Sequence, residues 1–208
     1  YVARDLNGFK TRTTGPRRGQ GLFVIGGSKG QLSARGETIV VTDQNGRQVD
    51  SYATPDAPSD AQRHLRVTEI MYNPSPLAGN TNDAQEFEYI EVKNISGSVT
   101  LDLAGVRFEG GIDFAFTGSA ITSLAPGARA LVVRNSSAIT ARYGAGLPLA
   151  GQHVGNLDNA GERIRLLDSV NEEILDFGYN NKWYPVTDGL GFSLVVVDES
   201  AQPDDWDS

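Results

Sequence analysis

One phrase occurs twice in this chain, and the repetition constrains the fold more than any other feature of the sequence. Residues 30–43 read GQLSARGETIVVTD, and residues 155–168 read GNLDNAGERIRLLD. They align without a gap, and the identical pairs are Gly30/Gly155, Leu32/Leu157, Gly36/Gly161, Glu37/Glu162, Ile39/Ile164 and Asp43/Asp168. A period of about 125–130 positions is the length of a whole domain, so we expect one folding unit to occur twice, in whole or in part.

The similarity extends on both sides of this phrase. Upstream, VARDLNGFKTR aligns with VVRNSSAITAR, whose last residue is Arg142. Downstream, and after one gap, Val49-Asp50 aligns with Leu175-Asp176. The first copy has no equivalent of the later GFSLVVVD. It is therefore expected to be incomplete, with open strand edges and core residues left uncovered.

These alignments predict three parts of the chain. Residues 1–53 are expected to be the C-terminal half of a module, and 54–64 a linker rich in Pro, Asp and Ser. Residues 65–208 are expected to be a complete module that ends in an acidic exit segment. The first residue is Tyr1, without a signal-peptide pattern, so we expect a processed or excised piece of a longer protein.

Short runs of β-branched and aromatic residues predict the fold class. The expected strands are 66–72, 86–94, 99–109, 112–116, 128–135, 162–168, 172–179 and 192–198. In GERIRLLD the apolar Ile164 and Leu166 alternate with Arg163 and Arg165, which is the pattern of a half-buried strand. Short strands separated by turn clusters indicate an all-β antiparallel sandwich or barrel.

One short helix is expected in each module. At 136–144, Ser136 or Ser137 is placed to cap the first free N–H groups and Gly144 to end the helix. Its counterpart is 5–12, with Asp5 as the N-cap.

Composition excludes several classes of protein. Apolar residues make up 39% of the chain and charged residues 21%, which favours a packed core over disorder. No run approaches eighteen apolar residues, so no membrane span is expected. Cysteine is absent, which excludes disulfides, zinc–thiolate sites and thiol nucleophiles.

The net charge of −8 is unevenly distributed. Residues 1–64 hold nine Lys/Arg and six Asp/Glu, a balance of +3, and residues 65–208 hold nine and twenty, a balance of −11. Nucleic-acid binding needs clustered positive charge, so no nucleic-acid partner is expected.

The ordered series VTEIMYNP, EFEYIEVKN, LDLAGVRFEGGIDFAF, LAPGARALVVRN, ARYG, GNLDNAGERIRLLD, ILDFGY and DGLGFSLVVVD resembles a bacterial lamin tail domain. The resemblance covers roughly 66–208, and 1–53 resembles the second half of the family. It implies an immunoglobulin-like antiparallel β-sandwich in a secreted or cell-surface bacterial protein. The family has no agreed activity and no catalytic residues to transfer. Trp206, in PDDWDS, is expected to cover the sandwich end.

Catalytic motifs are not found. His64 and His153 are far apart and form no HExxH or HxxxH spacing, which argues against a zinc hydrolase. The stretch 191–195, GFSLV, departs from the Gly-x-Ser-x-Gly elbow at its last position. The stretch 26–30, GGSKG, lacks the order of a P-loop and precedes an expected strand. We therefore predict that the chain is not an enzyme.

Two acidic sets are candidates for binding Ca²⁺ at a joint between modules, and no other cofactor is expected. The first set is Asp83, Glu86 and Glu88, and the second is Asp198, Asp204, Asp205 and Asp207. Carboxylate oxygens are the ligands that Ca²⁺ prefers. Solvated surface charge is the alternative interpretation.

A loop with two aromatic residues is a candidate for binding glycans. NNKWYPVTDG places Trp183 and Tyr184 beside Asn180, Asn181 and Asp188, which combines a stacking surface with hydrogen-bonding groups. In the alternative interpretation Trp183 folds back and covers the end of the sandwich, because Trp is usually buried for the most part.

The basic run KTRTTGPRR, with Lys10, Arg12, Arg17 and Arg18, is a candidate for contacting an acidic surface, and a solvated loop is the alternative. The sequence therefore favours a non-catalytic structural or interaction module, one of a tandem array, that serves spacing, assembly or adhesion. The alternatives are a glycan-binding module and an accessory module of an enzyme. The expected partners are neighbouring modules of the same or another chain, and glycans in the alternative.

Overall fold

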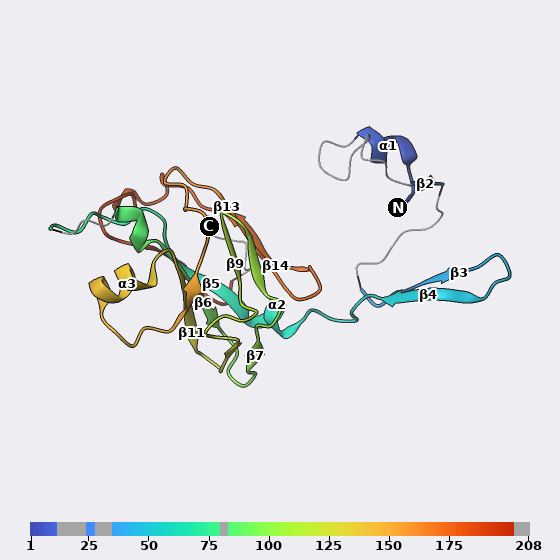
Figure 1. Ribbon diagram of the computed structural model, residues 1–208, viewed down its shortest axis with the longest axis horizontal. Helices are drawn as coiled ribbons and strands as arrows, with labels where there is room; N and C mark the ends of the chain where they lie inside the picture. Colours follow the sequence, from blue (N-terminus) through green and yellow to red (C-terminus); the bar gives the residue numbers. More distant parts are fainter. Residues whose placement is uncertain (12–23, 28–34, 80–82, 202–208) are drawn as a thin grey trace. The chain divides into compact units, whose positions relative to one another are not determined.

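The computed structural model describes residues 1–11, 24–27, 35–79 and 83–201 (Figure 1). The chain forms two compact units, and we describe each by itself. Unit 1 comprises Tyr1–Ala57, and unit 2 comprises Pro58–Ser208.

Unit 2 is a sandwich of two principal β-sheets, which confirms the all-β antiparallel fold expected from the sequence. The larger sheet contains, in spatial order, β12 (Leu149–Gln152), β11 (Arg129–Val133), β6 (Tyr89–Asn94), β5 (Leu65–Met71) and β15 (Leu194–Val195). The smaller sheet contains β14 (Glu173–Gly178), β13 (Arg163–Leu167), β8 (Arg107–Gly110) and β9 (Ile112–Ala115). A short ribbon pairs β7 (Leu101–Asp102) with β10 (Ser123–Leu124). Neighbouring strands are antiparallel except β11 and β12, which are parallel.

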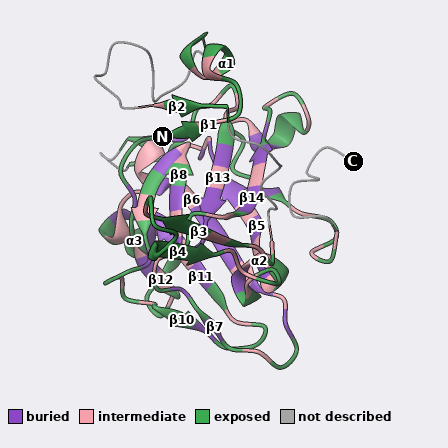
Figure 2. Cartoon of the chain, turned by 90° about the vertical axis from the view of Figure 1, so that its right-hand side faces the viewer, coloured by how far each residue is buried: buried purple, intermediate pink, exposed green. Residues whose placement is uncertain are grey.

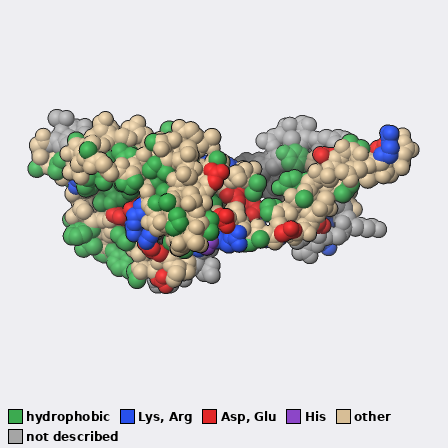
Figure 3. Space-filling view, turned by 90° about the horizontal axis from the view of Figure 1, so that it is seen from below, with side chains coloured by type: hydrophobic (Ala, Val, Ile, Leu, Met, Phe, Trp, Pro, Cys, Tyr) green, Lys and Arg blue, Asp and Glu red, His purple; other side chains and the backbone are tan. Residues whose placement is uncertain are grey.

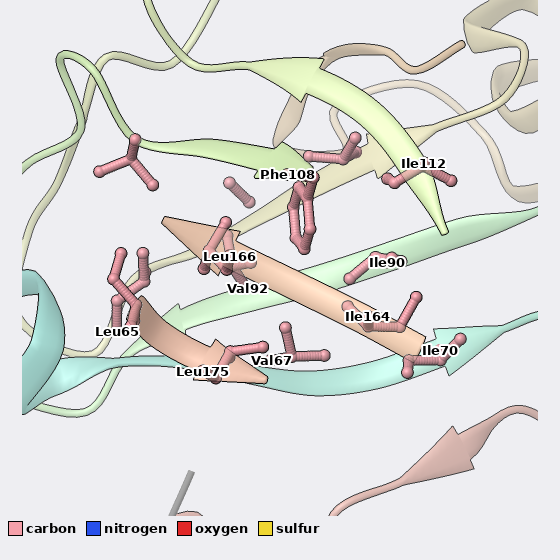
Figure 4. Packing of buried hydrophobic residues seen from close by; sticks show 14 of the residues in the cluster. Leu65, Val67, Ile70, Ile90, Val92, Phe108, Ile112, Ile164, Leu166 and Leu175 are labelled. Carbon is pink, nitrogen blue, oxygen red and sulfur yellow. The ribbon is translucent and has the colours of Figure 1, made fainter. Parts of the chain in front are cut away.

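The core of unit 2 lies between the two sheets. Ile164 and Leu166 of β13 are buried, while Arg163 on the same strand is exposed, as the alternation in GERIRLLD predicts. Figure 4 shows these apolar side chains of β13 with those of the facing strands β5 and β6. Full burial of one such side chain stabilises a fold by about 1.5–3 kcal/mol, so this layer is the main source of stability in unit 2.

The stretch 99–109, expected as one strand, forms two short strands. A turn separates β7 from β8, in which the N–H of Val106 donates to the carbonyl of Leu103 at 3.0 Å. Gly105 within this turn has a φ of +79°, and an added Cβ would lie 2.6 Å from that of Ser169. The break therefore follows from a backbone conformation that only glycine adopts there without strain. The expected strand 192–198 is reduced to the two residues of β15.

The expected helices form, with one change of cap. Helix α1 (Leu6–Thr11) follows Asp5, whose carboxylate accepts the N–H of Asn7 at 2.9 Å. Helix α3 (Ser136–Tyr143) is capped by Asn135 rather than by Ser136 or Ser137. Two 3₁₀ turns are also present, η1 (Ala84–Phe87) and η2 (Pro185–Thr187). Among the described residues no helix has both the length and the apolar character needed to cross a membrane.

A third helix, α2 (Asp60–His64), lies within the stretch 54–64 that was expected to be a linker. Ser59 and Gln62 form a reciprocal capping box at its start. The Ser59 hydroxyl also donates to Asp168 of unit 2 at 3.0 Å. The end of the expected linker is therefore an ordered element of unit 2.

Unit 1 contains two short strand pairs besides α1. Strands β1 (Val2–Ala3) and β2 (Ile25–Gly26) are parallel, and β3 (Thr38–Thr42) and β4 (Gln48–Ala53) form an antiparallel hairpin. Figure 2 shows that this hairpin is exposed over nearly its whole length, whereas the strands of unit 2 carry many buried positions.

The turn of the β3–β4 hairpin has the same construction as the turn between β13 and β14. Asp43 and Asp168 open the two turns, and each carboxylate accepts the N–H groups two and four residues further on. Each also exchanges the same two backbone hydrogen bonds across its turn. The residue three positions on has a positive φ in both, +79° at Gly46 and +67° at Asn171. The two turns are therefore of equal length and type.

Strand pairing extends this equivalence. The corresponding cross-strand pairs are Ile39–Tyr52 with Ile164–Phe177, and Val41–Asp50 with Leu166–Leu175. A register irregularity directly follows Val41 in one hairpin and Leu166 in the other. The gap that places Asp50 over Asp176 is therefore wrong, because the hairpins align without one and Asp50 occupies the position of Leu175.

Candidate interaction surfaces

One side of the β3–β4 hairpin is an exposed counterpart of core positions in unit 2. We call this side the hairpin face, made of Ile39, Val41, Asp50 and Tyr52. Val41 is 53% exposed and its counterpart Leu166 is 0% exposed, and Tyr52 and its counterpart Phe177 are 57% and 5% exposed. Within the described part of unit 1, β3 and β4 pair only with each other. The hairpin therefore presents an uncovered face together with free strand edges.

A β-bulge shapes the outer face of the larger sheet in unit 2. Val67 pairs with Val92 and Glu69 pairs with Glu91, so Thr68 is an extra residue in β5. Val67 faces the core, and the two consecutive residues Thr68 and Glu69 both lie on the outer face, where Thr68 donates to Glu91 and Glu69 accepts from Tyr89. The sequence carries a signal for this, because two polar residues separate the apolar Val67 from Ile70 and break the period of two.

Charged side chains lie in a row across this outer face. Glu91 accepts the Thr68 hydroxyl at 2.6 Å and forms an ion pair with Arg129. Glu199 pairs with Arg129 at 3.2 Å and with Lys93. On the side of unit 2 that Figure 3 shows, acidic and basic side chains also lie close to one another. Most charges in this row are therefore neutralised by neighbours.

Glu69 lies at the end of this row and is held by hydroxyl groups. Its Oε1 atom accepts the hydroxyls of Tyr89 and Ser193, both at 2.5 Å. Burial and the hydrogen bond to Glu69 raise the pKa of Tyr89 far above its ordinary value, so the tyrosine remains the donor. No lysine or arginine among the described residues forms an ion pair with Glu69.

A groove lies between this outer face and helix α3. Its volume is about 180 Å³, and its lining residues are Glu69, Tyr89, Glu91, Leu131, Ile139, Tyr143 and Leu147. The strands contribute the two carboxylates, and the helix and the loop after it contribute apolar side chains. The groove therefore has a negatively charged base and apolar walls.

Comparison with known proteins identifies the fold family. The family model for the Lamin Tail Domain matches residues 58–181, more than half of the chain. The chain belongs to the lamin tail domain family. No curated protein and no solved structure gave a match. Membership in this family, which is immunoglobulin-like and non-enzymatic, agrees with the sandwich of unit 2 and with the resemblance seen in the sequence.

Two ionisable side chains are buried within the lamin tail domain. Glu88 is 0% exposed, and its carboxylate accepts the N–H of Leu157 at 2.9 Å. Burial raises the pKa of Glu88 to about 7. His153 is 2% exposed, and burial, with the nearby Arg134 guanidinium, lowers its pKa to about 4. The sequence did not predict the burial of either side chain, because burial at these positions depends on the tertiary fold.

The loop proposed for glycan binding lies at and beyond the end of the family match. Trp183 is half-buried and packs against the core, and Tyr184 is 55% exposed. Asn181 donates to Asp188 at 3.2 Å, and the side chain of Asn180 caps the N–H of residue 182. These contacts favour the alternative in which Trp183 covers the sandwich, and glycan binding by this loop stays a prediction.

The residues proposed for calcium binding have separate protein partners. Asp83 accepts the N–H of Gln85 at 3.1 Å, and Glu86 accepts the amide of Asn135 at 2.8 Å. Glu88 is buried as described above, and Asp198 accepts the N–H of Ser200 at 2.9 Å. Across the described ranges, no three or more His, Asp or Glu side chains gather in a way that suits a metal ion. Asp204, Asp205, Asp207 and Trp206 lie outside the described residues.

The proposed basic run is described only at its start. Lys10 is exposed on α1, and Arg12, Arg17 and Arg18 lie outside the described residues. Contact of this run with an acidic surface therefore stays a prediction.

Proposed function

We propose that the chain is a non-catalytic interaction module, one of a tandem array of lamin tail domains in an exported bacterial protein. In this proposal residues 1–53 are the C-terminal half of a preceding copy, and the protein is secreted or attached to the cell surface. The work of the array is spacing, assembly or adhesion through β-sheet surfaces. The family assignment supports the non-catalytic part of the proposal.

The exposed hairpin face is the observation that carries the assembly role. In the lamin tail domain of unit 2, the equivalent hairpin is covered by the facing sheet and pairs along β13 with β8. The hairpin of unit 1 has the same turn and register but exposes Val41 and Tyr52. The partner that fits it is therefore the N-terminal half of another lamin tail domain, added by strand pairing from another chain or segment.

Asp50 constrains this partner further. It occupies the position of the buried Leu175, so close coverage of the hairpin face would place a carboxylate in a contact layer. Burying a charge is costly unless it is paired or hydrogen-bonded. We therefore expect the partner to present an Arg, a Lys or a hydroxyl group opposite Asp50.

Light scattering on the full chain tests this proposal. We expect the mass to rise with protein concentration, because an uncovered strand edge and apolar face favour association. Val41→Glu, on the hairpin face, is expected to abolish the rise. Val40→Glu is the matched control, because Val40 is 48% exposed on the opposite side of the same strand. A mass of one chain at every concentration, or equal effects of the two variants, would contradict assembly through the hairpin face.

A further inference from the structure

We propose that the groove between α3 and the outer face of the larger sheet binds a lysine side chain of a partner protein, with Glu69 accepting its ammonium group. The proposal concerns unit 2 alone and does not depend on the hairpin face. It goes beyond the assembly role, because it names the chemical group that the domain recognises.

The charge of the outer face is the first reason. Three carboxylates, Glu69, Glu91 and Glu199, share two cations, Arg129 and Lys93, among the described residues of the row. Both cations pair with Glu91 or Glu199, so the excess negative charge remains on Glu69. A partly buried carboxylate without a cation attracts one, since desolvation strengthens the interaction.

The walls of the groove are the second reason. Leu131, Ile139 and Leu147 line it together with the ring of Tyr143. The volume of about 180 Å³ equals that of about six waters at about 30 Å³ each, which is room for a chain of several carbon atoms. Lysine combines an apolar stem of this kind with a charged end.

The hydrogen bonds of Glu69 favour an ammonium over a guanidinium. Hydroxyls of the described residues reach Oε1 and leave Oε2 for an incoming donor. Arginine binds carboxylates best through two parallel hydrogen bonds to both oxygens, whereas an ammonium is a point charge that needs only one. A calcium ion would need six or more oxygen ligands, which this groove does not gather among the described residues.

The β-bulge adds to this arrangement. Val67, Glu69 and Ile70 pair with the consecutive residues Val92, Glu91 and Ile90, so Glu69 lies beside Glu91 on the outer face and Thr68 is the extra residue before it. The Thr68 hydroxyl donates to Glu91, which also pairs with Arg129, and so leaves the charge of Glu69 unchanged. Bulges are frequent beside functional sites.

Calorimetric titration of the full chain with short peptides tests the proposal. The probe is a peptide of glycine and serine with one central lysine, and the matched peptide carries norleucine, which keeps the alkyl chain and removes the charge. We expect the lysine peptide to bind at least tenfold more tightly than the norleucine peptide, and to weaken as salt is added. An arginine peptide is expected to bind more weakly than the lysine peptide.

Variants locate the site. Glu69→Gln is expected to remove the preference for lysine over norleucine, while Glu109→Gln, on the exposed side of the smaller sheet, leaves it unchanged. Tyr143→Ala tests the wall of the groove and serves as a second variant in case Glu69→Gln unfolds the domain. Tyr143 is 45% exposed, so its truncation is expected to preserve the fold. Equal binding of the lysine and norleucine peptides, or no binding of the lysine peptide, would overturn the proposal. So would an unchanged preference for the lysine peptide in both Glu69→Gln and Tyr143→Ala. Val41→Glu, which tests assembly, leaves the groove intact, so the two proposals fail independently.

Discussion

At the scale of single residues, Glu88 and His153 are perturbed in opposite directions. Glu88 has its pKa raised from 4.5 to about 7 by burial, and the nearby carboxylates of Glu162 and Asp83 act in the same direction. His153 has its pKa lowered from 6.5 to about 4, so its imidazole is neutral at physiological pH. Each buried group therefore favours its neutral form, and each ties the stability of the domain to pH.

Glu88→Gln is expected to change the pH dependence of unfolding. Between pH 4.5 and 7 the folded state holds a proton on Glu88 that the unfolded state releases, so the contribution of Glu88 is present below pH 4.5 and is lost as pH rises through 7. His153 acts in the opposite sense, since its contribution is present above pH 6.5 and is lost as pH falls towards 4. In the wild-type protein the two slopes oppose each other.

With Gln at position 88, only His153 of this pair still makes the free energy of unfolding depend on pH. The stability of the variant relative to wild type should rise by about 3 kcal/mol between pH 4.5 and 7. Urea unfolding followed by circular dichroism at four pH values measures this, with Glu109→Gln as the control. Parallel stability curves for wild type and Glu88→Gln would show that the carboxyl has an ordinary pKa.

At the scale of elements, the helix caps show how well local sequence predicts a helix start. The predicted cap of one helix is displaced by one residue, and one capped helix was not predicted. The helix at 136–144 was predicted correctly, but Asn135 accepts the first N–H groups because it is the extended residue directly before the helix, whereas Ser136 and Ser137 lie inside it. The helix α2 was not predicted, because Pro, Asp and Ser before it indicate a linker as readily as a capped helix start. Its capping box is visible in the sequence as Ser59 followed three residues later by Gln62.

Ser59→Ala is expected to destabilise unit 2 by about 1–2 kcal/mol, because it removes an N-cap and the hydrogen bond to Asp168 together. Ser137→Ala is the matched control, since Ser137 is exposed in the first turn of α3 but does not cap it, and its effect should stay within about 0.5 kcal/mol. Urea unfolding measures both changes. Equal losses in the two variants would mean that the α2 cap does not stabilise the domain.

At the scale of the whole molecule, the sandwich and most of its strands could be predicted from alternation and turn residues. The short strands β10 and β12 could not, because two to four residues carry too little periodicity. The groove could not be predicted either, since its lining residues come from β5, β6, β11, α3 and the loop after α3, and meet only in the folded domain. The candidate sites predicted from the sequence were residues close together along the chain, because a single sequence does not show which distant residues meet in the fold.

The two hairpins offer a comparison of burial at equal turn type and register. We expect the backbone amides of β13 and β14 to exchange with solvent at least a hundredfold more slowly than those of β3 and β4 at low concentration. The registers within the hairpins are the same, so the difference reports the covering layers together with the pairing of β13 to β8. Hydrogen exchange followed by NMR measures it. Equal protection of both hairpins in the single chain would show that β3 and β4 are covered in solution.

The bulge at Thr68 has a consequence for how such a surface arises. A strand that lacked Thr68 would keep Val67, Glu69 and Ile70 on their present faces, because their partners Val92, Glu91 and Ile90 are consecutive. Gain or loss of a single codon at this point of the gene would therefore change the local bend and twist of β5, and the hydrogen bond from Thr68 to Glu91, without turning the strand over. Within this family, the length of β5 can then vary by one residue at this position while the core stays the same.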